Sequence, residues 1–209
     1  MRALELAETL PLLVRTPLEW GSAVLTDPVA LLGDHAFLEK KAANNAMELM
    51  TRWPGDWIPG WVETMTAVAR DEAAHLAQVT HLLLSRGGRL DRVHKNPYAH
   101  ALRLLVRKGE AAEALDRLFV SALIEARSCE RFALLSAASR DRGLSAFYHR
   151  LFASELNHYQ VFLTLAGRLA GRRAVDTRWR QMLEAEAVII SRQPFGPRIH
   201  SGFPEPGPD

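Results

Sequence analysis

Apolar residues recur along most of this chain at intervals of three and four, the spacing that gathers side chains on one face of an α-helix. This pattern predicts four long helices, at about residues 28–52, 59–85, 111–138 and 144–169. Shorter helices are predicted at residues 4–14, 98–106 and 176–191. The sequence has no strong strand-like alternation of apolar and polar residues, so the predicted fold class is all-α.

Turn residues set the ends of these helices. Asp27-Pro28 combines a capping side chain with proline at the first helical position, and "WPGDWIPG" forces a tight turn. The connections between the long helices are therefore short, long and short, which indicates the ferritin-like four-helix bundle: two antiparallel helical hairpins joined by a crossover. We expect one domain over residues 1–209, with the core bundle in residues 27–171 and an irregular tail in residues 193–209.

The composition adds broad limits. Hydrophobic residues make up 48% of the 209 residues, enough for a full core. Cys129 is the single cysteine, which excludes an intramolecular disulfide and is typical of a reducing compartment. No signal peptide opens the chain and no apolar run is long enough to span a membrane, so we expect a soluble, cytoplasmic protein without a membrane partner.

The charges support RNA binding only weakly. The formal net charge is +2, and nearly all of the 26 cationic side chains are arginines, which suit bidentate recognition of phosphate. These arginines are spread along the chain and form no single basic run.

Each of the four long helices carries a glutamate within its apolar stripe. In the helix at 59–85 the stripe reads Trp, Met, Val, Glu, His, Val, Leu, with the spacing of a heptad seam. The helix at 144–169 repeats this interruption, and the other two long helices contribute one glutamate each. The polar residues in the stripes are Glu39, Glu72, His75, Glu125, Glu155 and His158.

The order of these six residues indicates two copies of one hairpin. Each copy has a glutamate on its first helix and Glu-x-x-His on its second, and antiparallel packing would bring the four sites to a similar height. Isolated buried charges carry large desolvation penalties, which a pair of bound metal ions would remove. Carboxylate and imidazole ligands suit iron or manganese, and four glutamates with two histidines form the dinuclear site of ferritin-like bundles.

The competing interpretation is a helical bundle with partly buried ion pairs and no metal. One Glu-x-x-His match is close to chance, but two matches on equivalent helices, each preceded by a stripe glutamate, are much rarer. A similar match, Asp91-x-x-His94, lies in a turn region without a partner glutamate, and we expect it to be solvated.

Residues next to the stripe are candidates for supporting the ligands. Asp71 is positioned to orient a ligand histidine, and Ser154 holds the matching place before Glu155. His35 lies one turn before Glu39 and is a supporting donor, an extra ligand or a core histidine.

Other polar residues near Glu125 have simpler interpretations. Cys129, one turn later, is expected to fill core space. Glu130 points elsewhere and is expected to pair with an arginine. Arg127 and Arg131 are either its ion-pair partners or side chains that hold phosphates of a nucleic acid.

Five segments carry more specific information: "DHAFLEKKAANNAMEL", "ARDEAAHLAQV", "IEARSCERFALL", "ASELNHYQVFL" and "IHSGFP". Together they resemble the tRNA isopentenyladenosine hydroxylase family, from about residue 20 to residue 204. The Glu-x-x-His pairs are shared with ferritin-like metal proteins in general, whereas "DHAxxEKKAA", "EARSCERF" and "HSG" are much more specific to this family.

The resemblance implies an oxygen-dependent, non-haem di-iron monooxygenase. Such an enzyme hydroxylates the isopentenyl group of 2-methylthio-isopentenyladenosine next to the anticodon of tRNA. It implies two iron ions, with manganese as a possible substitute, and O2 as co-substrate. The metal ligands carried over are Glu39, Glu72, His75, Glu125, Glu155 and His158. Electrons would come from an external reductase or ferredoxin-type donor, because no flavin or iron–sulfur motif is present.

The same resemblance implies an apolar wall around the prenyl group, for which Phe37, Phe132 and Phe152 are candidates. It implies tRNA, and not DNA, as the nucleic-acid partner.

Three alternative functions stay open at this point. A ferroxidase or iron-storage protein shares the fold, and so does a dimetal catalase or peroxidase, although a rubrerythrin would add a four-cysteine site. A metal-free helical interaction module is the third.

Overall fold

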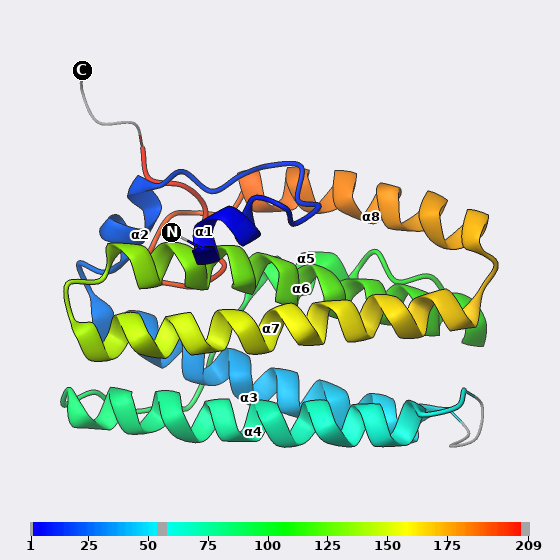
Figure 1. The fold of residues 1–209 in the computed structure, drawn as a ribbon, viewed down its shortest axis with the longest axis horizontal. Helices are drawn as coiled ribbons and strands as arrows, with labels where there is room; N and C mark the ends of the chain where they lie inside the picture. Colours follow the sequence, from blue (N-terminus) through cyan, green and yellow to red (C-terminus); the bar gives the residue numbers. More distant parts are fainter. Residues whose placement is uncertain (1, 54–57, 206–209) are drawn as a thin grey trace. The chain divides into compact units, whose positions relative to one another are not determined.

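The computed structural model describes residues 2–53 and 58–205. Within these residues the chain forms eight α-helices and no β-strand, so the predicted all-α class is confirmed. None of the described helices has both the length and the apolarity that crossing a membrane requires. The helices, labelled in Figure 1, are α1 (Arg2–Ala7), α2 (Glu19–Val24), α3 (Pro28–Arg52), α4 (Trp61–Ser85), α5 (Pro97–Arg103), α6 (Glu110–Ala138), α7 (Arg142–Leu169) and α8 (Arg172–Ser191).

The chain divides into two compact units. The smaller unit, Asp27–Lys95, contains α3 and α4. The larger unit combines Met1–Thr26 with Asn96–Asp209 and contains the other six helices. Each unit holds one of the two predicted long hairpins. The prediction that residues 1–209 form a single domain stays a prediction.

The helices α3 and α4 lie side by side as a hairpin (Figure 1). Asp27 caps α3, because its carboxylate accepts a hydrogen bond at 3.0 Å from a backbone N–H of the first turn, and Pro28 opens the helix as predicted. The indole Nε1 of Trp61 donates to the carbonyl of Leu49 at 3.0 Å and ties the start of α4 to the end of α3. The predicted turn "WPGDWIPG" includes residues 54–57, which lie outside the described residues.

The helix α6 is the centre of the larger unit. It packs along α7, and α1, α2, α5 and α8 also contact it. As a result nearly every side chain from Ala114 to Leu135 is buried, polar ones included. The partner helix α7 begins after Asp141, whose carboxylate accepts hydrogen bonds from the N–H groups of Gly143 and Leu144 at 2.8 and 3.1 Å.

The four long helices lie close to their predicted positions, whereas the short ones differ. The first helix was predicted too long: α1 ends at Ala7, and Pro11 beyond it lacks the N–H that helix continuation requires. The six-residue α2 is too short to show a helical period in the sequence. The helix α8 begins at Arg172 rather than at Asp176.

The described part of the C-terminal tail is irregular, as predicted, but it is firmly packed. The indole Nε1 of Trp20 donates to Ser201 Oγ at 3.0 Å, and Arg131 Nη2 donates to the carbonyl of Ser201 at 3.1 Å. The imidazole of His200 lies 3.2 Å from Ser128 Oγ and packs on the ring of Tyr98 with centroids 4.7 Å apart. The "HSG" segment therefore acts as a packing element that joins α2, α5 and α6.

We expect Gly202→Ala to lower the free energy of unfolding by about 2–4 kcal/mol. A Cβ at this position would lie 1.8 Å from the carbonyl oxygen of Gln193, so the backbone would have to shift. The matched control is Gly167→Ala in α7, where a Cβ meets nothing within 4 Å and where alanine favours the helix by up to about 1 kcal/mol. Urea unfolding followed by circular dichroism measures both. Gly202→Ala as stable as the wild type would contradict this account of the tail.

A buried ionic network surrounds Arg127. Its Nη2 lies 2.8 Å from Glu186 Oε1, its Nη1 pairs with Glu130, and Tyr98 donates to the same Glu186 oxygen at 2.9 Å. Burial opposes the charge of Arg127, but Glu130 and Glu186 outweigh it and raise the pKa of the guanidinium. The prediction that Glu130 pairs with an arginine is confirmed. Arg127 is fully buried and cannot reach the phosphates of a nucleic acid.

Arg131 is also fully buried, so phosphate binding is excluded for it as well. Its guanidinium carbon lies 3.9 Å from the ring centroid of Trp20 and 5.6 Å from that of Phe203. Burial, together with the nearby charge of Arg127, lowers the pKa of Arg131 well below its usual range. The two arginines are thus structural residues of the core.

Candidate metal centre

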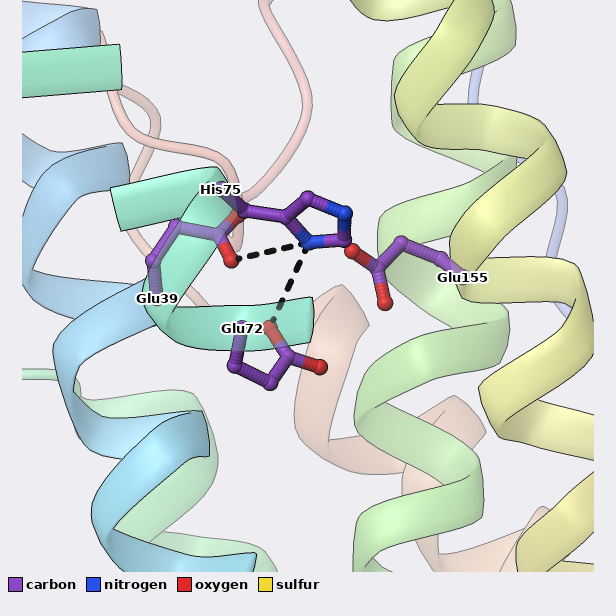
Figure 2. Close-up of side chains that lie close together, drawn as sticks. All are labelled: Glu39, Glu72, His75 and Glu155. Atoms are coloured by element: carbon purple, nitrogen blue, oxygen red, sulfur yellow. Dashed lines mark ion pairs between the residues drawn. The ribbon is translucent and has the colours of Figure 1, made fainter. Parts of the chain in front are cut away.

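The α3–α4 hairpin brings three of the predicted ligands together. Glu39 comes from α3, and Glu72 and His75 come from successive turns of one face of α4. His75 Nδ1 lies 3.6 Å from Glu39 Oε2 and 3.6 Å from Glu72 Oε2, as the dashed lines in Figure 2 show. One ligand atom from each residue lies within 4.8 Å of the others. This hairpin therefore presents two carboxylates and one imidazole to a single point.

These side chains are buried because the stripe of α4 continues on both sides of them. Val68 and Val79 lie one turn before and one turn after the pair, and both are core residues. Glu39, Glu72 and His75 are 4%, 1% and 7% exposed. Two carboxylates held this close in a core are costly as bare charges, because both must lose their hydration. The donor set fits a metal ion, and its oxygen and imidazole ligands suit iron.

His35 supports one of these carboxylates. Its Nε2 lies 2.5 Å from Glu39 Oε1, and the imidazole is fully buried. Of the three interpretations open from the sequence, this geometry fits a supporting hydrogen bond that fixes the Glu39 carboxylate. Asp71 pairs with Arg70 at 2.9 Å and its side chain is 35% exposed, whereas Ser154 is half-buried on α7. Supporting roles for Asp71 and Ser154 stay predictions.

The α6–α7 hairpin holds the second set of predicted ligands. Glu155 and His158 on α7 are each 1% exposed, and Glu125 on α6 is 6% exposed. His158 Nδ1 lies 2.9 Å from Glu155 Oε2. Burial and then the charges of Glu155 and Glu125 raise the pKa of the Cys129 thiol.

Cys129 is a core residue, as expected. It is fully buried, and its Sγ lies 3.7 Å from the carbonyl oxygen of Phe152. Its burial agrees with the interpretation of this side chain as a small residue that fills core space. The predicted apolar residues Phe37, Phe132 and Phe152 are buried too.

The interpretation of His94 as a solvated residue is wrong. Its Nε2 lies 2.7 Å from Asp34 Oδ1, and its Nδ1 lies 2.8 Å from Lys41 Nζ. Its ring stacks on Phe37 with centroids 4.9 Å apart and an angle of 6° between the planes. Asp34, Phe37 and Lys41 share one face of α3, but no sequence signal shows that a residue of the distant crossover packs there. Asp91 is exposed, as expected.

Each unit thus contains the same half-site: one glutamate on the first helix of a hairpin and Glu-x-x-His on the second. Two such hairpins joined by a long crossover define the class of ferritin-like proteins with a dinuclear carboxylate site. The sequence profile described as tRNA-(MS[2]IO[6]A)-hydroxylase (MiaE) matches residues 6–201. The chain belongs to this family.

Two curated relatives agree with this assignment. The tRNA 2-(methylsulfanyl)-N(6)-isopentenyladenosine(37) hydroxylase of Pseudomonas putida is 38% identical over 190 residues, which cover 91% of each chain. The enzyme of the same name from Salmonella typhimurium is 33% identical over 174 residues, which cover 83% of this chain and 63% of that protein.

A solved structure is similar over nearly the whole chain. It is described as Protein 43 with aldehyde deformylating oxygenase activity from Synechococcus. The TM-score is 0.85 at 34% identity, and the match covers 92% of this chain and 96% of that one. This similarity confirms the predicted ferritin-like fold class.

Proposed function

We propose that this protein is an oxygen-dependent di-iron monooxygenase that hydroxylates the isopentenyl group of 2-methylthio-isopentenyladenosine in tRNA, next to the anticodon. The observation that carries the proposal is the pair of buried half-sites in a chain of this hydroxylase family. The family and the names of its relatives supply the substrate class. Metal binding at the two half-sites would explain why each of these carboxylates is buried.

In this proposal six residues hold two iron ions, and manganese is a possible substitute: Glu39, Glu72, His75, Glu125, Glu155 and His158. The buried carboxylates and imidazoles within each hairpin support it, because such a donor set matches the ligand preference of iron. When bound, the two ions would supply the redox chemistry that activates O2. An external reductase or ferredoxin-type protein would supply electrons.

The protein's own residues orient the ligands and exclude water. The hydrogen bond from His35 restricts Glu39 to one orientation. Phe152 is buried one turn before Glu155 on α7, whereas Phe37 stacks on His94 on the side of α3 that faces the crossover. An apolar side chain beside Glu155 suits a prenyl group and keeps water away from the reacting carbon.

The substrate adenosine lies in a single-stranded loop of tRNA. Bases in such loops can be turned out of the stack and inserted into a protein site without melting a duplex. Since tRNA is the substrate, we place the protein in the cytoplasm.

Deleting the gene in its host is expected to remove the hydroxylated prenyl nucleoside from tRNA and to leave the unhydroxylated precursor in its place. Mass spectrometry of tRNA nucleosides measures both, and the wild-type gene supplied in trans is expected to restore the product. Persistence of the hydroxylated nucleoside at its normal level would contradict the proposal.

The alternative function is a ferroxidase or a dimetal peroxidase or catalase that does not act on tRNA. It predicts that the deletion strain keeps the hydroxylated nucleoside, while the purified protein oxidises iron(II) or consumes hydrogen peroxide at catalytic rates. A peroxidase of the rubrerythrin type would need a cysteine cluster, and Cys129 is the single cysteine of this chain.

A further inference from the structure

The crossover between α4 and α5 carries more cationic than acidic side chains. The cationic side chains of residues 86–95 are Arg86, Arg89, Arg92 and Lys95, against one acidic residue, Asp91. Arg89, Arg92 and Lys95 are exposed. Within the described residues none of these three forms an ion pair, in contrast to Arg70, which pairs with Asp71.

This crossover is held against the α3–α4 hairpin by specific contacts. His94 anchors it to α3 through Asp34, Lys41 and the stacked ring of Phe37. At the other end of the segment, a Cβ on Gly88 would lie 2.3 Å from Leu83 Cδ1 and 2.9 Å from Val29 Cγ1, so the chain passes close to these side chains of α4 and α3. A cationic segment held on both sides is preorganised for a ligand.

The residues of α3 that contact the crossover lie at the same level along the helix axis as the proposed metal ligand Glu39. Asp34 and Lys41 bracket Glu39 along the helix, and Lys40, which directly follows Glu39, is exposed. By contrast, Arg142 at the start of α7 lies 13 residues before Glu155, or about 20 Å along the axis. Through His94 the crossover is therefore held at the level of Glu39 along α3.

We propose that Lys40, Arg89, Arg92 and Lys95, here called the crossover patch, bind the phosphates that flank the target adenosine in the anticodon loop. This inference rests on the proposed function and names the surface that holds its substrate. Exposed arginine and lysine side chains without carboxylate partners are the groups that neutralise nucleic-acid phosphates. Such contacts set the position of the RNA and leave recognition of the base to the site itself.

The side chains between the cations fit a nucleic-acid loop better than an acidic protein. Val93 is 75% exposed and Leu90 is 40% exposed, so apolar and cationic groups alternate along the crossover. Unstacked nucleotides present apolar base faces beside each phosphate, which matches this alternation.

The test uses the iron-loaded protein and an RNA stem-loop that carries the prenylated adenosine. The crossover variant is Arg89→Gln/Arg92→Gln/Lys95→Gln. The matched control is Arg172→Gln/Arg173→Gln/Arg180→Gln, which removes three exposed arginines from α8, one of them paired with Asp176 at 3.8 Å. Both variants change the net charge equally, so a general electrostatic effect would weaken both alike.

We expect the crossover variant to raise the Kd for the stem-loop at least about tenfold and to reduce the slope of log Kd against log salt by about 2, since each single-strand phosphate contact contributes about 0.7. The control is expected to bind within about twofold of the wild type. Equal Kd values for the crossover variant and the wild type would overturn the assignment of the crossover patch to RNA binding while leaving the proposed function intact. A wild type that does not bind the stem-loop would overturn both.

An electron-donor protein with an acidic surface is the competing partner for this patch. In that case the crossover variant would bind the stem-loop normally but would accept electrons from the donor more slowly than the control. That result would overturn the assignment to RNA.

Discussion

Replacing Glu72 with alanine is expected to remove iron from the protein and to lower kcat/KM for tRNA hydroxylation by at least about a thousandfold. Glu72 is 1% exposed and lies 3.6 Å from His75 in the proposed ligand set. Loss of groups that merely orient a ligand costs about 10–100-fold in many metalloenzymes, so loss of a ligand itself should cost more. Metal analysis and single-turnover assays with substrate tRNA measure the two effects.

The same variant separates a metal site from a structural ion pair. Without metal, Glu72 lies close to Glu39 in a buried environment, so its removal should leave the apo protein as stable as the wild type or more stable. The matched control is Glu63→Ala, which removes an exposed glutamate from the same helix and should change neither iron content nor activity. If Glu72→Ala kept its iron and its activity, the ligand assignment would be wrong. His158→Ala poses the same question for the α6–α7 half-site.

Replacing Arg127 with methionine is expected to lower the free energy of unfolding by about 3–5 kcal/mol, the usual effect of removing one partner of a buried ion pair. Arg127 and Glu186 are both fully buried, and Glu130 is 5% exposed. Methionine would leave two carboxylates in the core without their cation. Urea denaturation at constant pH measures the difference.

The control for this prediction is Arg172→Met. Arg172 also pairs with a carboxylate, Asp176 at 3.8 Å, but its side chain is 96% exposed, and its loss should change stability by less than about 0.5 kcal/mol. Adding Glu130→Gln and Glu186→Gln to the Arg127 variant removes the uncompensated charges and should restore part of the stability. Equal effects of the Arg127 and Arg172 variants would show that the network contributes little.

The sequence predicts the long helices and the half-sites for one physical reason. Burying a charge is costly, so a carboxylate within an apolar stripe needs an explanation. Glu72 and Glu155 can therefore be recognised from the sequence without knowing their neighbours in space. The burial of all six predicted ligands agrees with that reasoning. The pairing of each Glu-x-x-His with a glutamate on a partner helix follows from the hairpin topology.

The remaining features depend on contacts between distant parts of the chain. Arg127 is followed by Glu130 three residues later and looks like half of a surface ion pair; its burial depends on Glu186, which belongs to another helix. His94 pairs with Asp34, which lies 60 residues away in the sequence, so no local pattern around His94 indicates the contact. Such contacts are set by tertiary packing, which periodicity along one helix does not encode.

Incubating the iron-loaded protein with prenylated tRNA, a reductant and isotopically labelled O2 tests the central claim most directly. Mass spectrometry of the digested tRNA identifies the source of the new oxygen atom. The account predicts a hydroxylated prenyl nucleoside that carries one labelled oxygen, absent when iron is removed. A product whose oxygen comes from water, or no hydroxylated nucleoside at all with full iron loading, would contradict it.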